Sequence, residues 1–178
     1  MIFKTSIGSF VCHVLILLLS FGVPKGILKM VDKEVQKVFD VATIQLEGIA
    51  LPKGIGKELP AIISSENFFR LKQEDSLMGY VYLGKAPSKT ANFDYMVILN
   101  QELEVLQTKV LIYREEYGGE IGSKRWLKQF IGLSGKDRVD YKTNIDGIAG
   151  ATISVRSMTI SMDKLFQTIG ELQLKNLL

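Results

Sequence analysis

Hydrophobic and polar residues are arranged along this chain in patterns that predict amphipathic helices near both ends. Residues 28–39 place apolar side chains at helical spacing between Lys, Asp and Glu, which is typical of a helix with one buried face. The clearest pattern lies near the C-terminus, where apolar residues recur at steps of three and four over about five turns. They are Val155, Met158, Met162, Leu165, Phe166, Ile169 and Leu172. We therefore predict a long C-terminal helix with both methionines in the core.

Between these helices the pattern changes to runs that favour β-strands. Apolar and β-branched residues dominate segments 78–83, 93–99 and 104–113, and turn residues separate the segments. Asn100 and Gln101 lie between the second and third runs, which predicts a hairpin. Strands joined by a hairpin pair in the antiparallel direction. We therefore expect an antiparallel sheet.

Three further segments complete the predicted fold. Glycine and proline are concentrated between residues 48 and 60, which predicts irregular loops, and 43–46 is a candidate short strand before them. In 120–131, apolar residues fall near one face, as expected of a helix packed on the sheet. These residues are Ile121, Trp126, Leu127, Phe130 and Ile131. Together the elements predict the α+β class, with helices packed on an antiparallel sheet and a long helix at the C-terminal end.

The N-terminal segment has the composition of an export signal or a membrane anchor. Residues 6–23 contain no charged residue, and Lys4 precedes a dense apolar stretch. Ser20 and Gly22 are the small residues that a signal peptidase requires, which favours cleavage after Gly22. An apolar run of about 18 residues is also long enough to remain as an anchor. Both interpretations place the globular part outside the cytoplasm, exported across or anchored to the cytoplasmic membrane.

The scarcity of cysteine and histidine restricts the chemistry of the globular part. The chain has one of each, Cys12 and His13, and both lie in the N-terminal segment. The remainder therefore cannot build zinc fingers, thiolate-held iron-sulfur clusters, histidine-ligated haem or Cys/His nucleophiles, and we predict no metal site. Redox chemistry would need an organic cofactor. The small net charge of +3 gives no reason to expect a nucleic-acid partner.

A loop of small residues directly before the C-terminal helix is the candidate site. Its sequence is Asp146-Gly147-Ile148-Ala149-Gly150-Ala151-Thr152. Small side chains let a ligand approach the backbone, and the free N–H groups of a helix N-terminus favour an anion such as a phosphate. A plain turn with a Thr or Ser cap is the alternative that the residues alone leave open. The loop is neither a Walker A sequence nor a dinucleotide fingerprint.

This loop resembles that of the FMN-binding domain family, which includes the C subunit of the sodium-translocating NADH:quinone reductase and the G subunit of the Rnf complex. The family pattern is Asp, two variable residues, Ser or Thr, Gly, Ala, and Thr or Ser. The chain matches it at Asp146, Gly150, Ala151 and Thr152, and Ala149 replaces the usual hydroxyl residue. The resemblance implies that FMN is joined to Thr152 through a phosphoester bond. In the family, an exported flavin transferase that uses FAD and magnesium forms this bond.

The resemblance extends upstream to a glycine turn and a helix that carries a tryptophan. Glu115, Glu116, Gly118 and Gly119 lie at the position of that turn, and Trp126 lies in the helix. The resemblance implies that Gly118 and Gly119 approach the flavin. Glu115 and Glu116 are either part of the flavin site or solvated charges at the end of a strand.

Taken as a whole, the resemblance implies an extracytoplasmic electron-transfer protein that binds FMN. The chain would then divide into a leader, an N-terminal helix with an irregular extension, and an FMN-binding domain, at residues 1–22, 23–74 and 75–178. The residues implied in cofactor binding are Thr152, Asp146, Gly147, Ala149, Gly150, Ala151, Glu116, Gly118 and Gly119. The expected partners are the flavin transferase and membrane-associated redox proteins, with no nucleic acid.

Three points stay open from the sequence. Asp146 either assists the transferase in recognition or activation of the hydroxyl, or only shapes an Asx-type turn. The protein is alternatively a flavin-linked reductase of a small extracytoplasmic acceptor. The third alternative is a cofactor-free accessory domain that lost flavin attachment through the change at Ala149.

Overall fold

The computed structural model describes residues 23–178, and the predicted leader at residues 1–22 lies outside them. The strands are β1 (Gln45–Gly48), β2 (Phe68–Gln73), β3 (Ser76–Pro87), β4 (Asn92–Leu99) and β5 (Val105–Ile112). The helices are α1 (Lys25–Phe39), α2 (Lys124–Leu127) and α3 (Thr152–Leu174). Short 3-10 turns are η1 (Ile55–Lys57), η2 (Gly119–Gly122) and η3 (Lys128–Phe130).

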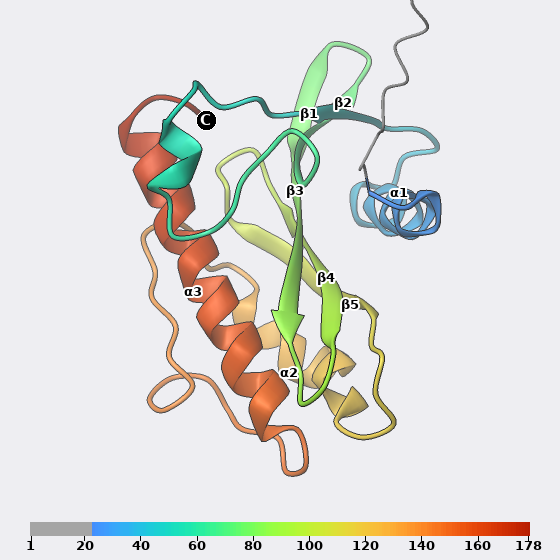
Figure 1. The fold of residues 1–178 in the computed structure, drawn as a ribbon. Coiled ribbons are helices and arrows are strands. Elements are labelled where there is room, and N and C mark those ends of the chain that lie inside the picture. The colour runs from blue at the N-terminus through green and yellow to red at the C-terminus, as the bar shows by residue number, and fades with distance from the viewer. Residues whose placement is uncertain (1–22) are drawn as a thin grey trace, which may run out of the picture.

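The five strands form one sheet in the order β1-β2-β3-β4-β5, and each neighbouring pair is antiparallel. Figure 1 shows α3 along one face of this sheet and α1 against the other. The α+β class, the antiparallel pairing and the hairpin between β4 and β5 are therefore confirmed. β1 and β2, which come from the part of the chain before residue 75, are the first strands of the same sheet.

The central strands are buried on both faces, which explains their nearly continuous apolar sequence. In β4, Met96 and Ile98 belong to the core under α1, whereas Tyr95, Val97 and Leu99 belong to the core under α3. Successive residues of a strand point to opposite faces. A sheet with helices on both sides therefore favours apolar residues on both faces of such a strand.

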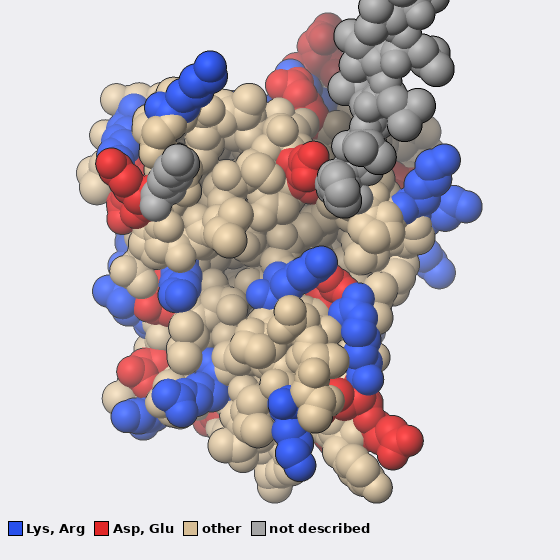
Figure 2. Space-filling model, viewed as in Figure 1, with Lys and Arg blue, Asp and Glu red and all other residues tan. Residues whose placement is uncertain are grey.

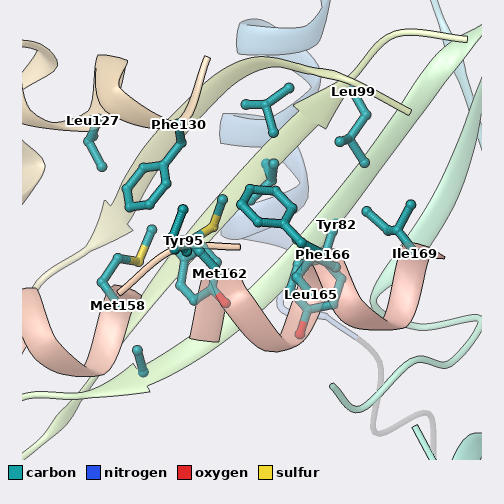
Figure 3. Close-up of a cluster of buried hydrophobic side chains, with 14 of the residues drawn as sticks. Tyr82, Tyr95, Leu99, Leu127, Phe130, Met158, Met162, Leu165, Phe166 and Ile169 are labelled. Carbon is teal, nitrogen blue, oxygen red and sulfur yellow. The ribbon is translucent and has the colours of Figure 1, made fainter. Parts of the chain in front are cut away.

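α3 provides the largest part of the core. Its buried face faces the sheet and the segment around α2, as Figure 3 shows for Met158, Met162 and Phe166. These three side chains are 0% exposed. The prediction of the long C-terminal helix and of core positions for both methionines is confirmed. The irregular segment before β2 also packs on this helix, because the Ala61 N–H donates to the Thr168 Oγ1 at 2.8 Å.

The sequence-based prediction of one helix at 120–131 is wrong. The segment consists of η2, α2 and η3, and Ser123 is extended between η2 and α2. Gly119 and Gly122 have low helix propensity, which favours this interruption. Ile131 is 53% exposed because the chain becomes extended there. The other predicted apolar residues, from Ile121 to Phe130, are buried as expected.

Two further differences concern the N-terminal strands. β2 was not predicted, because its charged residues obscure the alternation; Arg70 and Lys72 pair with Glu47 of β1. The predicted short strand at 43–46 is displaced, since β1 covers Gln45–Gly48. Both segments become strands because they pair with residues far away in the sequence, and not because their own residues show a strong alternating pattern.

Positive and negative side chains are mixed on the face drawn in Figure 2, with no large patch of one sign. Within residues 23–178, no helix is both long enough and apolar enough to cross a membrane.

Candidate functional site

Thr152, the residue that the sequence places at the flavin, is the first residue of α3 and is exposed. Ala151 occupies the N-cap position, no side chain caps the helix, and the first turn contains no acidic residue. The first N–H groups of a helix have no acceptor within it and carry the positive end of the helix dipole. The hydroxyl of Thr152 is therefore accessible at a position that favours a phosphate.

The loop before Thr152 is held through its backbone. The Trp126 indole N–H donates to the carbonyl oxygen of Asp146 at 2.6 Å, and the Asp146 N–H donates to the Gln129 Oε1 at 2.8 Å. Further along, the Ala151 N–H donates to the carbonyl oxygen of Ile148 at 3.1 Å. The segment near Trp126 thus fixes the start of the loop and leaves its small residues at the surface.

The predicted site residues in this loop fall into two groups by exposure. Ala151 is 3% exposed and packs into the core beside α3. The remaining members are exposed; they are Asp146, Gly147, Ala149 and Gly150. Gly150 has a φ of 83°, which a residue with a side chain rarely adopts. The surface of the loop is therefore mostly backbone and short side chains that a ligand can approach.

The structure brings the glycine turn next to this loop. Gly118 has a φ of 84°, and a Cβ built on it would lie 3.6 Å from the carbonyl oxygen of Gly150 and 3.7 Å from the Cα of Ala151. The same Cβ would come within 2.7 Å of the Tyr113 hydroxyl. Gly118 is therefore required both by its conformation and by the close approach of Tyr113. Gly119, the next residue, is exposed and begins η2.

Tyr113, at the end of β5, links the turn to α3. Its hydroxyl donates to the carbonyl oxygen of Tyr117 at 3.0 Å and lies 3.1 Å from the Ser154 Oγ. A phenol has one hydrogen to donate, so Ser154 is the donor in the second contact. No sequence motif marks Tyr113 or Gln129 as site residues. Tyr113 directly follows a strand, and Gln129 lies shortly after Trp126. These positions are the features of the sequence that point to the two residues.

Glu115 is not a freely solvated charge, because its carboxylate makes structural contacts. Its carboxylate accepts hydrogen bonds from the Ser88 hydroxyl, from the Thr90 N–H at 2.7 Å and from the Ala91 N–H at 3.1 Å. It therefore joins the glycine turn to the loop between β3 and β4. The Ser88 hydrogen bond, followed by the backbone donors, lowers the pKa of Glu115 to about 2. Its neighbour Glu116 is exposed.

We expect Glu115→Gln to lower the urea midpoint at neutral pH, and the difference from wild type to shrink as the pH falls from about 4.5 toward about 2. The folded pKa of this carboxyl lies below its unfolded value. The ionised group therefore stabilises the fold above the unfolded pKa, and this contribution is lost as the pH falls through the folded pKa. Urea titrations across this range measure it. Glu116→Gln is the control, and an equal shift in both variants at neutral pH would contradict the role of Glu115.

Most of the predicted residues lie on an open surface, and all of them lie away from the largest cavity described. That cavity, of about 470 Å³, lies between the start of α1, the segment before β2 and the β3–β4 pair, and Tyr82, Asp94 and Lys164 are among its lining residues. None of the predicted site residues lines it. Within residues 23–178, no group of three or more His, Cys, Asp or Glu side chains is arranged to hold a metal. The loop at Thr152 is therefore a surface site.

These residues fit the binding of FMN. The uncapped start of α3 provides N–H donors for a phosphate, and the exposed small residues of the loop leave room for the rest of the molecule. Gly118 keeps a side chain out of the space between the turn and Tyr113.

Comparisons with known proteins agree with this geometry. The family model described as FMN-binding domain matches residues 90–167. The fold is similar to the crystal structure of NqrC from Shewanella oneidensis, with a TM-score of 0.56 and 15% sequence identity, over 83% of this chain and 97% of that chain. At this identity the likeness shows the fold. No curated protein matches the sequence.

The matched region contains β4, β5, the glycine turn, the loop and the first two thirds of α3. It therefore includes every residue that the sequence analysis assigned to the flavin. Residues 90–167 of this chain match the FMN-binding domain family, and this match indicates FMN as the cofactor.

Proposed function

We propose that this protein is an extracytoplasmic electron carrier whose FMN is joined to the Thr152 Oγ through a phosphoester bond. The observation that carries the proposal is the exposed hydroxyl of Thr152 at the uncapped start of α3, within the FMN-binding match. The partners on this view are a flavin transferase during maturation and membrane-associated redox proteins during function.

FMN would supply the redox chemistry, since residues 23–178 have no Cys or His with which to form a redox-active thiol or hold a haem or iron-sulfur cluster. The chain holds the cofactor. The first N–H groups of α3 bind the phosphate, and Trp126 and Gln129 fix the loop that precedes Thr152. Because the loop lies at the surface, electrons can pass to a partner protein without a small substrate entering a cavity.

The attachment step is a transfer from FAD. A bond forms between the Thr152 Oγ and the phosphorus of the FMN part, the pyrophosphate bond of FAD breaks, and AMP leaves while the hydroxyl proton passes to a base. No electron is gained or lost. A threonine hydroxyl is a weak nucleophile unless a base or metal activates it, so activation belongs to the transferase and its magnesium. The exposed Asp146 is in a position to be recognised by that enzyme.

The location outside the cytoplasm is proposed from the sequence of residues 1–22. Their apolar run after Lys4 is the feature that supports export or anchoring. A covalent bond would also be useful there, because a dissociated FMN would be lost from the cell.

We expect intact wild-type protein, co-expressed with a flavin transferase in an export-competent host, to gain the mass of one FMN residue. Thr152→Ala should show no gain, because the hydroxyl that forms the bond is absent. Flavin fluorescence in a denaturing gel should follow the same pattern. Thr143→Ala is the matched control, since Thr143 is another exposed threonine shortly before the loop. It should carry FMN like wild type. An unchanged mass gain in Thr152→Ala, or none in wild type, would reject the attachment.

A further inference from the structure

Tyr117 is a large aromatic side chain that the fold leaves 82% exposed. It lies in the glycine turn, directly before Gly118. Leaving such a ring in water gains none of the stabilisation that burial of apolar surface gives. The exposed ring of Tyr117 is therefore available for contact with a bound cofactor.

The backbone of Tyr117 is held on both sides. Its carbonyl oxygen accepts a hydrogen bond from Tyr113 at 3.0 Å, and Gly118 follows in the left-handed conformation. Two residues earlier, the Glu115 carboxylate is bound by the loop between β3 and β4. The exposed ring is thus presented by a fixed turn rather than by a free chain.

This turn lies beside the loop that carries Thr152. A Cβ built on Gly118 would lie 3.6 Å from the carbonyl oxygen of Gly150 and 3.7 Å from the Cα of Ala151. Tyr117 directly precedes Gly118, and Thr152 directly follows Ala151. A flavin ring, joined through its ribityl chain to a phosphate at Thr152, can reach the Tyr117 side chain.

The other aromatic side chains near the loop are already engaged. Trp126 is 4% exposed and gives its N–H to the loop, and Tyr113 bonds to the turn and to α3. Tyr141 has the Arg156 guanidinium at 5.2 Å from its ring centre. Among these aromatic side chains near the loop, Tyr117 is the one that the fold leaves mostly exposed.

We infer that the isoalloxazine ring of FMN packs against the side chain of Tyr117. The inference rests on the proposed position of FMN at Thr152. Offset stacking of aromatic rings would bury an apolar face of each. It would also shield one side of the flavin from water, which is one way in which a protein adjusts the electronic properties of a flavin.

Flavin fluorescence reports this contact. A tyrosine in contact with an excited flavin quenches it by giving it one electron, which then returns to the tyrosine, so no net oxidation occurs. In FMN-loaded full-length protein, we expect the fluorescence quantum yield per flavin to rise severalfold in Tyr117→Leu. Tyr117→Phe should also raise it, because phenylalanine is a poorer electron donor, and Tyr117→Trp should keep it low. Glu120→Gln, an exposed position in the same segment, is the control and should match wild type.

Loading is measured on each sample by intact mass and visible flavin absorbance, and folding by circular dichroism. An unchanged quantum yield in Tyr117→Leu with FMN present by mass would overturn the inference, and Tyr117 would then face a partner protein instead. If the mass shows no linked FMN, the Thr152 attachment has failed. The yields are then compared with FMN bound from solution, so the contact with Tyr117 is still tested.

Discussion

Phe166→Ala is expected to lower the free energy of unfolding by about 3–5 kcal/mol, as large-to-small changes at fully buried aromatic positions do. Phe166 is 0% exposed and lies on the buried face of α3, near Leu165 and Tyr82 in Figure 3. The truncation loses the contacts of the ring and leaves a cavity between the helix and the sheet. Since small domains have a total stability of about 5–15 kcal/mol, the variant should be close to unfolding.

Urea denaturation followed by circular dichroism measures this loss. The matched control is Ile160→Ala on the same helix, whose side chain is 39% exposed. Its free energy of unfolding should stay within about 1 kcal/mol of wild type, because a half-exposed side chain gives up less apolar contact. Similar losses in the two variants would mean that the buried face of α3 is not the main source of stability.

The sequence predicted α3 well because one face of a helix repeats at a period that the chain shows over many turns. Met158 and Phe166 lie on that face and are fully buried. β4 was equally visible, since burial on both sheet faces produces a continuous apolar run. These elements are determined by local sequence together with burial.

Elements that depend on distant partners were harder to predict. β2 contains Arg70 and Lys72, whose charges are matched by Glu47 on the neighbouring strand. The broken segment at 119–130 has the right buried residues, but Ser123 is extended and divides it. A hydrophobic pattern identifies which side chains are buried, and tertiary packing decides how the backbone between them runs.

The candidate site divides in the same way. The loop at Thr152 was recognisable from its own residues, and the structure places it at the start of α3 as expected. The contacts that hold the loop join residues far apart in the chain, such as Trp126 to Asp146 and Tyr113 to Ser154. Glu115 is the clearest example of a contact that the local sequence does not reveal, because its three hydrogen-bond donors lie in the loop between β3 and β4. A local sequence pattern does not show which distant residues form these hydrogen bonds.

Gly170→Ala is expected to destabilise the protein, although alanine forms helices better than glycine. In an open helix position the change from glycine to alanine gains about 1 kcal/mol. In α3, however, a Cβ on Gly170 would lie 2.6 Å from the carbonyl oxygen of Gly135. The obstacle is backbone, so the helix or the segment at Gly135 must move. We expect the overpacking, which costs about 1–3 kcal/mol in well-packed regions, to outweigh the gain in helix propensity.

The matched control is Gly26→Ala in α1, where a Cβ would have no atom within 4 Å. This variant should be stabilised by up to about 1 kcal/mol, because the helix propensity gain is unopposed. If Gly170→Ala lowers the urea midpoint and Gly26→Ala raises it, glycine is needed at position 170 because two backbone segments approach closely there. Stabilisation of both variants would mean that Gly135 gives way easily, and that the contact between α3 and the segment before the loop at Thr152 is loose.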